Sequence, residues 1–295
     1  MGGKQKRMAI LKGIFRKQTG SIGDMTLRVV NGQTVTSEKV TRNTSKTFAQ
    51  MVRRVQWANL VNLFRAFEGT LHPSFESRPR SWSDFNAFIS ANMGRQGVYL
   101  TSELASQGAA VVAGYQITRG SLPSIDTEIA SGVGKSDISV GTLVLDEETT
   151  VADFSNAIVE NNSDWEYGDQ LSCFILEQRV NSVTGIPYVK VYAYEITLDG
   201  DNTDELLADV VSAEAFSVVD NKVGTGAAIN GGVAYVHSRK LASKVAVSTQ
   251  DVVVANSILA QYQSDTARNT AILSYGGKTS SDFLTPNLDE IVAAD

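Results

Sequence analysis

The amino-acid sequence predicts an α+β fold, in which a basic β-hairpin and helix module over residues 1–95 precedes an acidic, mainly β, sandwich-like domain over residues 96–295. The hydrophobic pattern passes from alternation to helical periodicity and then to several short alternating segments, which is typical of β-sandwiches. The charge also changes sign near Gly94 and Gly97. The first module has 16 Lys/Arg against 5 Asp/Glu, a formal charge of +11, and the second has 10 against 27, a charge of −17.

Strands open the first module. Residues 8–41 alternate between apolar and polar side chains on both sides of Asn31-Gly32, a pair that favours a two-residue hairpin turn. Residues 46–68 then follow helical periodicity, and Thr44-Ser45 can cap the start of that helix. A proline-containing loop and a second helix over residues 81–93 complete the module.

The first of these helices carries apolar side chains on two nearly opposite stripes. The early stripe holds Phe48, Met51, Val52 and Val55, and the later stripe holds Trp57, Leu60, Val61, Leu63, Phe64 and Phe67. An apolar stripe on a helix has to be covered. We therefore expect this helix to pack on its own hairpin at one end and on another element, or another subunit, at the other.

The acidic domain consists mainly of predicted strands. Its expected elements are strands over residues 109–118, 171–180, 186–198, 231–237 and 244–254 and helices over residues 150–160 and 256–275. The second and third strands form a hairpin around Thr184-Gly185. Tyrosines on one face of the third strand alternate with valines on the other, so both faces are apolar enough for a central strand. A polar tail follows the last helix.

Composition and motifs argue against an enzyme. The hydrophobic content of 42% is sufficient for a packed core, and the single cysteine, Cys173, excludes an intrachain disulfide and a cysteine-based zinc site. The segments GVGKS (132–136) and GGKT (276–279) lack the first glycine of a phosphate-binding loop. The acidic turn 199–205 lacks the glycine of a calcium loop. We predict no catalytic residue, no metal ligand and no cofactor.

One enzymatic alternative stays open at this point. The only histidines are His72 and His237, and each lies apart from the other in the predicted elements. A hydrolase in the β domain would need a pocket that holds His237 together with a nucleophile or a carboxylate, since a general base has to be oriented to act. We also expect neither a secretory signal nor a membrane span, because no apolar segment is long enough for either.

Basic residues of the first module are the candidate functional residues. They are Arg16, Lys17, Arg28, Arg53, Arg54 and Arg65. Such a density of positive charge can neutralise phosphates without regard to nucleotide sequence. It can equally dock on an acidic protein surface, and the acidic domain of a neighbouring copy is the most direct one. Head-to-tail contacts of this kind close into rings when the rotation permits.

Three segments of the first module resemble an uncharacterised domain family of gut Bacteroidetes and their crAss-like phages. They are ILKGIFRKQTGSIGDMTLRVVNGQTVTSEKV, TSKTFAQMVRRVQWANLVNLFRAF and SDFNAFISANM. Gln50, Arg53, Arg54 and Trp57 match a Q-x-x-R-x-x-F/W helix of that family, and Phe85, Asn86 and Phe88 match its F-N-x-F helix. Residues 237–250 are similar to its closing strand pair, while the middle of the chain departs from it. The family carries no known activity, so the resemblance implies a phage or prophage setting and no catalytic residue.

We therefore expect a structural protein of the phage virion, such as a ring, collar or tail component, that acts by oligomerisation and by contacts with other virion proteins. The particle would be assembled in the host cytoplasm. The alternative is a nucleic-acid-binding protein that uses residues 1–95. Neither function requires a membrane or a cofactor.

Overall fold

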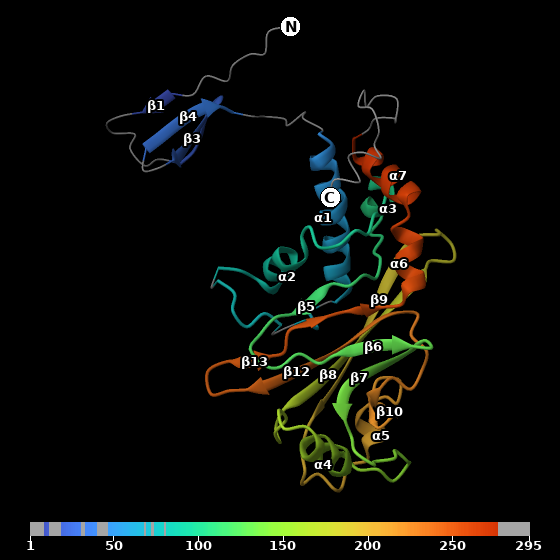
Figure 1. The fold of residues 1–295 in the computed structure, drawn as a ribbon. Helices are drawn as coiled ribbons and strands as arrows, with labels where there is room; N and C mark the ends of the chain where they lie inside the picture. The colour runs from blue at the N-terminus through green and yellow to red at the C-terminus, as the bar shows by residue number, and fades with distance from the viewer. Residues whose placement is uncertain are drawn as a thin grey trace. The chain divides into compact units, whose positions relative to one another are not determined.

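The computed structural model describes residues 9–11, 19–30, 33–39, 47–67, 69–71, 74–79 and 81–276, and confirms a mixed α+β fold with an N-terminal hairpin (Figure 1). The chain divides into two compact units, Met1–Lys46 and Thr47–Asp295. We had placed the division near residue 95. The difference arises because the helices that follow Lys46 share a hydrophobic core with residues 98–258, so they belong to the second unit.

Unit 1 is a four-stranded antiparallel sheet in the order β1-β4-β3-β2. Its strands are β1 (Ala9–Leu11), β2 (Gly20–Ile22), β3 (Met25–Val30) and β4 (Gln33–Glu38). Val30 pairs with Gln33, so a two-residue connection joins β3 to β4 at the position that Asn31-Gly32 predicts. A second tight turn with Gly23 at φ 57° joins β2 to β3.

A central antiparallel sheet forms the middle of unit 2. Its strands run β13 (Val245–Val247), β12 (Gly231–Lys240), β8 (Gln170–Val180) and β9 (Pro187–Thr197), and β15 (Val253–Val254) also pairs with β12. The predicted hairpin of β8 and β9 is confirmed over eleven residue pairs. Alternate side chains of β8 enter two different cores, as Phe174 and Leu176 face one and Leu171 and Cys173 the other.

Two layers cover the faces of this sheet (Figure 1). On one face lie α1 (Phe48–Ala66), α2 (Asp84–Asn92), α3 (Ser102–Ser106), the short pair β5 (Gln116–Thr118) and β14 (Gln250–Asp251), and α6 (Asn256–Tyr262). On the other lie a second sheet, ordered β10 (Ser217–Val219), β11 (Lys222–Gly224), β7 (Val133–Ser139) and β6 (Thr127–Ala130), with α4 (Val151–Asn161) and α5 (Leu207–Val210). Thr150 caps α4 together with Asp153, which explains where that predicted helix begins.

Most of both stripes of α1 is covered within the described part of the chain, but Trp57 of the later stripe is 47% exposed. Met51 and Val55, from the early stripe, pack against Ala271 and Ile272 of the last helix, α7 (Asp265–Gly276). The later stripe enters the large core beside the central sheet. The partner of the early stripe is therefore α7, another element of the same chain, which is one of the two alternatives that we left open for this helix. Thr47 caps the helix, whereas the predicted cap at Thr44-Ser45 lies outside the described residues.

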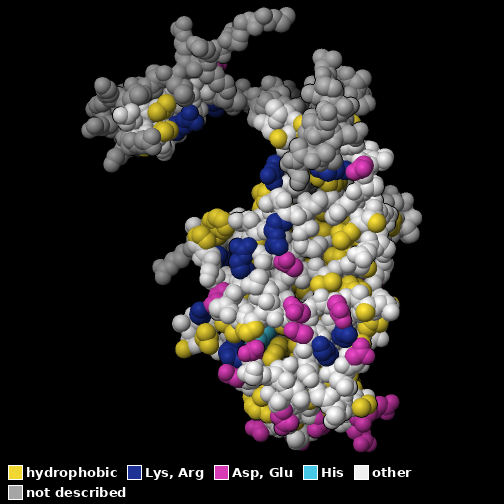
Figure 2. Space-filling model, in the orientation of Figure 1, with side chains coloured by type: hydrophobic (Ala, Val, Ile, Leu, Met, Phe, Trp, Pro, Cys, Tyr) yellow, Lys and Arg dark blue, Asp and Glu magenta, His cyan; other side chains and the backbone are white. Residues whose placement is uncertain are grey.

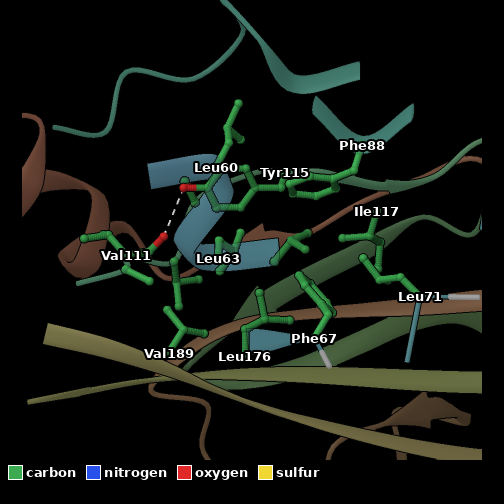
Figure 3. Close-up of a cluster of buried hydrophobic side chains, with 14 of the residues drawn as sticks. Leu60, Leu63, Phe67, Leu71, Phe88, Val111, Tyr115, Ile117, Leu176 and Val189 are labelled. Carbon is green, nitrogen blue, oxygen red and sulfur yellow. Dashed lines mark hydrogen bonds between the residues drawn. The ribbon is translucent and has the colours of Figure 1, made fainter. Parts of the chain in front are cut away.

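The predicted strand over residues 109–118 is a strand only at β5. Residues 109–115 are largely buried in the large core without belonging to a strand, and side-chain amides supply several of their hydrogen-bond partners. Asn59 accepts from the backbone N–H of Val111 at 3.2 Å, and Asn62 donates to the carbonyl of Ala109 at 2.8 Å. The Tyr115 hydroxyl donates to the Val111 carbonyl at 3.0 Å, amid the apolar side chains drawn in Figure 3. Buried backbone groups are satisfied in this way without a sheet.

Candidate functional site

The six basic residues that we predicted do not form one module. Arg28 lies on β3 of unit 1, whereas Arg53, Arg54 and Arg65 lie on α1 of unit 2. Arg16 and Lys17 lie outside the described residues. Arg54 and Arg65 share one side of α1, about 16 Å apart along its axis. Arg53 points elsewhere and donates to Gln56 Oε1 at 3.1 Å.

The two units also carry charges of opposite sign, although the separation is smaller than the +11 and −17 on either side of the boundary that we predicted. Unit 1 has 10 Lys/Arg against 2 Asp/Glu, a formal charge of +8 in 46 residues. Unit 2 has 16 against 30, a charge of −14. Within unit 2, residues 121–230 alone have 4 against 20, which is −16. Figure 2 shows acidic side chains gathered around the end of unit 2 where Figure 1 places α4 and α5.

One face of the unit 1 sheet carries exposed apolar side chains, beside Thr34 and Glu38, which pair with Val29 and Met25. Paired residues of an antiparallel sheet project to the same side, and Ile22 pairs with Met25, which shares its face with Leu27 and Val29 on β3. Leu27 is buried, but the exposed fractions of Ile22, Met25 and Val29 are 58%, 52% and 38%. We define these four residues as the apolar sheet face. Alternation along MTLRVV could have shown this face from the sequence.

A buried ionic cluster lies between β12 and the turn before β8. The Nε2 atom of His237 lies 2.8 Å from Oδ2 of Asp169, and both side chains are 2% exposed. Arg239 donates through Nε to Oδ1 of Asp169 at 2.7 Å and through a terminal nitrogen to Oδ2 at 2.7 Å. The backbone N–H of Glu166 completes the shell of the carboxylate at 2.9 Å. Asp169 is thus held by three partners.

Next to this cluster is a polar cavity of about 270 Å³. Trp165 and His237 line it, and their rings stack with centroids 3.9 Å apart. Asp137, Asp164 and the amides of residues 161–162 form other parts of its wall. The pocket and carboxylate that the hydrolase alternative needs are therefore both present, but the only hydrogen bond recorded for the His237 ring, among the described residues, is the one to Asp169.

The pKa shifts of the cluster have identifiable causes. Burial lowers the pKa of His237, and the carboxylate of Asp169 offsets only part of that effect, so the imidazole is neutral at pH 7. Burial raises the pKa of Asp169, but hydrogen bonds from Arg239, from the Glu166 backbone and from His237 together bring that pKa below its ordinary value. The ionised carboxylate of Asp169 thus orients a neutral His237 and links the end of β12 to the turn that precedes β8.

This assignment predicts a pH dependence of stability. The pKa of His237 is lower in the folded chain than in the unfolded chain, so the unfolded chain takes up a proton first as the pH falls below about 6.5. Folded stability therefore decreases on acidification, by at most about 1.4 kcal/mol per pH unit from this group. Urea unfolding at pH 7.5 and 5.5 measures the decrease. We expect a smaller decrease in His237→Gln; equal decreases in both proteins would contradict the assignment.

The other motifs of the sequence have structural roles. Ser131 and Gly132, both at positive φ, form the two-residue turn between β6 and β7, so GVGKS leads into a strand and not into a helix. Cys173 is buried, and burial raises the pKa of its thiol to about 12. The acidic turn 199–205 is largely exposed, and no group of three metal-ligating side chains occurs among the described residues.

Within the described part of the chain, no helix is long and apolar enough to cross a bilayer. Comparisons of the chain with protein-family models, with curated proteins and with solved structures give no significant match.

Proposed function

We propose that this chain is a structural protein of a phage particle, a ring, collar or tail component, and that it works by oligomerisation through its N-terminal unit. The observation that carries the proposal is the exposure of Ile22, Met25 and Val29 on one face of the unit 1 sheet. The resemblance of residues 8–93 to a domain family of phages and their hosts supports the setting, and the proposed place of action is the virion, assembled in the host cytoplasm.

Unit 1 is a small sheet of 46 residues that buries few of its own side chains. A sheet is stable when a hydrophobic face is packed against another layer, and among the described side chains of unit 1 only Leu27 and Thr34 are buried. Covering a side chain such as Ile22 or Met25 contributes about 1.5–3 kcal/mol. A partner surface would therefore stabilise the sheet, and multicopy assembly provides such a surface in every neighbour.

Negative-stain electron microscopy of the purified chain tests this proposal. We expect particles that contain several copies with a repeated outline, because each copy offers the same sheet to its neighbour. A field of uniform particles of single-chain size, at concentrations where virion proteins assemble, would contradict it.

A second candidate function rests on the charge of unit 1, which is +8 in 46 residues. A nucleic-acid-binding protein of this kind would bind DNA or RNA with a log affinity that falls steeply with log salt concentration. The variant in which Arg16, Lys17, Arg53 and Arg54 become Glu would lose that binding. Fluorescence anisotropy with labelled single- and double-stranded DNA and RNA measures it, and no binding at about 50 mM salt would remove this candidate.

A further inference from the structure

We propose that a polar cavity on the helical face of the central sheet binds a neutral, polyhydroxylated ligand, a single saccharide unit. The cavity has a volume of about 290 Å³ and lies beside the large core, to which Phe174 of its lining belongs. All of its lining residues are in unit 2. The inference therefore goes beyond the proposed assembly through unit 1 and does not depend on it.

The floor of the cavity is a grid of paired polar residues on three neighbouring strands. Gln170 of β8 pairs with Thr197 of β9 on one side and with Ser238 of β12 on the other. Two residues farther along β8, Ser172 pairs with Glu195. Paired residues of an antiparallel sheet project to the same side, and all five line the cavity. Their side chains are therefore within reach of one small ligand, since neighbouring strands are only about 5 Å apart.

Further hydroxyl groups come from the segments that cover this face of the sheet. Thr70 and Ser74 follow α1, and Thr118 lies on β5. The backbone N–H of Arg119 donates to the Ser74 carbonyl at 2.9 Å, and the Thr118 hydroxyl donates to the Ser248 carbonyl at 2.8 Å. A hydroxyl that donates in this way can still accept through its oxygen. The fold therefore holds hydroxyl groups on the cavity wall as well as on its floor.

Several polar groups of the cavity have no partner within the chain. Ser172 is only 6% exposed, yet its hydroxyl makes no hydrogen bond to any residue in the described part of the chain. The hydroxyl of Thr197 and the ammonium of Lys240 are likewise unpaired among the described residues. Buried polar groups in proteins are normally hydrogen-bonded. The Ser172 hydroxyl thus finds its partner in a molecule that enters the cavity.

The chemistry of the lining favours a ligand that both donates and accepts hydrogen bonds and has no net charge. One carboxylate oxygen of Glu195 accepts from Nε2 of Gln170 at 2.6 Å, which leaves the other oxygen for a ligand hydroxyl. Lys240 can only donate, and its charge offsets that of Glu195. Val236 and Val245 add apolar surface. A saccharide ring matches this lining, because it has hydroxyls around its rim and C–H groups on its faces.

Saturation-transfer difference NMR of the full chain with glucose, galactose, mannose and N-acetylglucosamine tests the site. We expect saturable binding of at least one of them, with a dissociation constant of about 0.1–10 mM for so small a contact. Ser172→Ala and Glu195→Ala are each expected to weaken this binding by about five- to tenfold, because each removes one hydrogen bond to the ligand. Glu160→Ala is the matched control, since it removes an exposed carboxylate on α4, outside the cavity.

Saturable binding that both cavity variants weaken and the control retains would support the inference. Glu195 is exposed, so its variant is expected to fold even if Ser172→Ala does not. No saturable binding of any of the four sugars up to about 50 mM would overturn the inference. Binding that Glu195→Ala and Glu160→Ala leave equally strong would place the sugar elsewhere and overturn it too. Neither of these results would affect the proposed function, which is tested by assembly alone.

Discussion

Replacing Asp169 with alanine is expected to lower the free energy of unfolding by about 3–5 kcal/mol, because it removes one partner from a buried ionic cluster. The substitution leaves His237 without its hydrogen bond and Arg239 without the carboxylate that accepts from it twice. It also removes the acceptor for the Glu166 backbone N–H. Few native proteins have more than about 15 kcal/mol of stability, so the loss is large.

Urea unfolding followed by circular dichroism measures this loss, and Glu166→Ala is the matched control. Glu166 also pairs with Arg239, at 3.0 Å, but its side chain is exposed. An exposed ion pair contributes about 0–1 kcal/mol, so the control is expected to unfold almost as the native chain does. If Asp169→Ala lowers the free energy of unfolding no more than Glu166→Ala does, the ionic cluster does not stabilise unit 2.

The second large effect is on assembly. Changing Met25 and Val29 together to glutamate is expected to weaken self-association by at least about tenfold, because the exposed parts of the two side chains contribute about 1.4 kcal/mol or more of apolar burial at the contact. Both residues are exposed within the chain, so unit 2 is expected to keep its fold.

Light scattering at about 10 μM, a concentration that resolves a micromolar dissociation constant, measures the effect. Val183→Glu is the control, since it places the same charge on an exposed valine outside unit 1. We expect the double variant to be monomeric and the control to assemble like the native chain. Equal masses for all three proteins would show that the apolar sheet face is not the contact. A circular dichroism spectrum of each variant verifies that the strands persist.

Elements with local signals could be predicted from the sequence. The Asn31-Gly32 signal correctly predicts that Val30 pairs with Gln33 across β3 and β4, and the Thr150 cap marks the start of α4. The hairpin of β8 and β9 likewise depends on alternation close to its turn. In each case the residues that determine the element lie within it or beside it.

Features that depend on distant contacts could not be predicted. The division at Lys46 follows from the packing of α1 against α7, more than 200 residues later in the chain. Residues 109–115 have the apolar pattern of a strand, but the amides of Asn59 and Asn62 satisfy their backbone. The Asp169–His237 pair joins residues 68 positions apart, and no local pattern marks either of them as a partner of the other.

The same comparison changes the grounds for oligomerisation. The two apolar stripes of α1 favour a second element or a second subunit, and within unit 2 both are covered except at Trp57, which is 47% exposed. The separation of charge remains, with +8 on the 46 residues of unit 1 and −14 on unit 2. The exposed residues Ile22, Met25 and Val29 of the unit 1 sheet thus favour assembly more than α1 does.

Sedimentation equilibrium of the native chain is the most direct test of assembly through unit 1. The chain mass is 31.7 kDa. We expect the average mass to rise to a multiple of this value between about 1 and 100 μM at low salt, and to fall when salt screens the opposite charges of the two units. A single species of 31.7 kDa across the whole range, at low salt, would contradict the account.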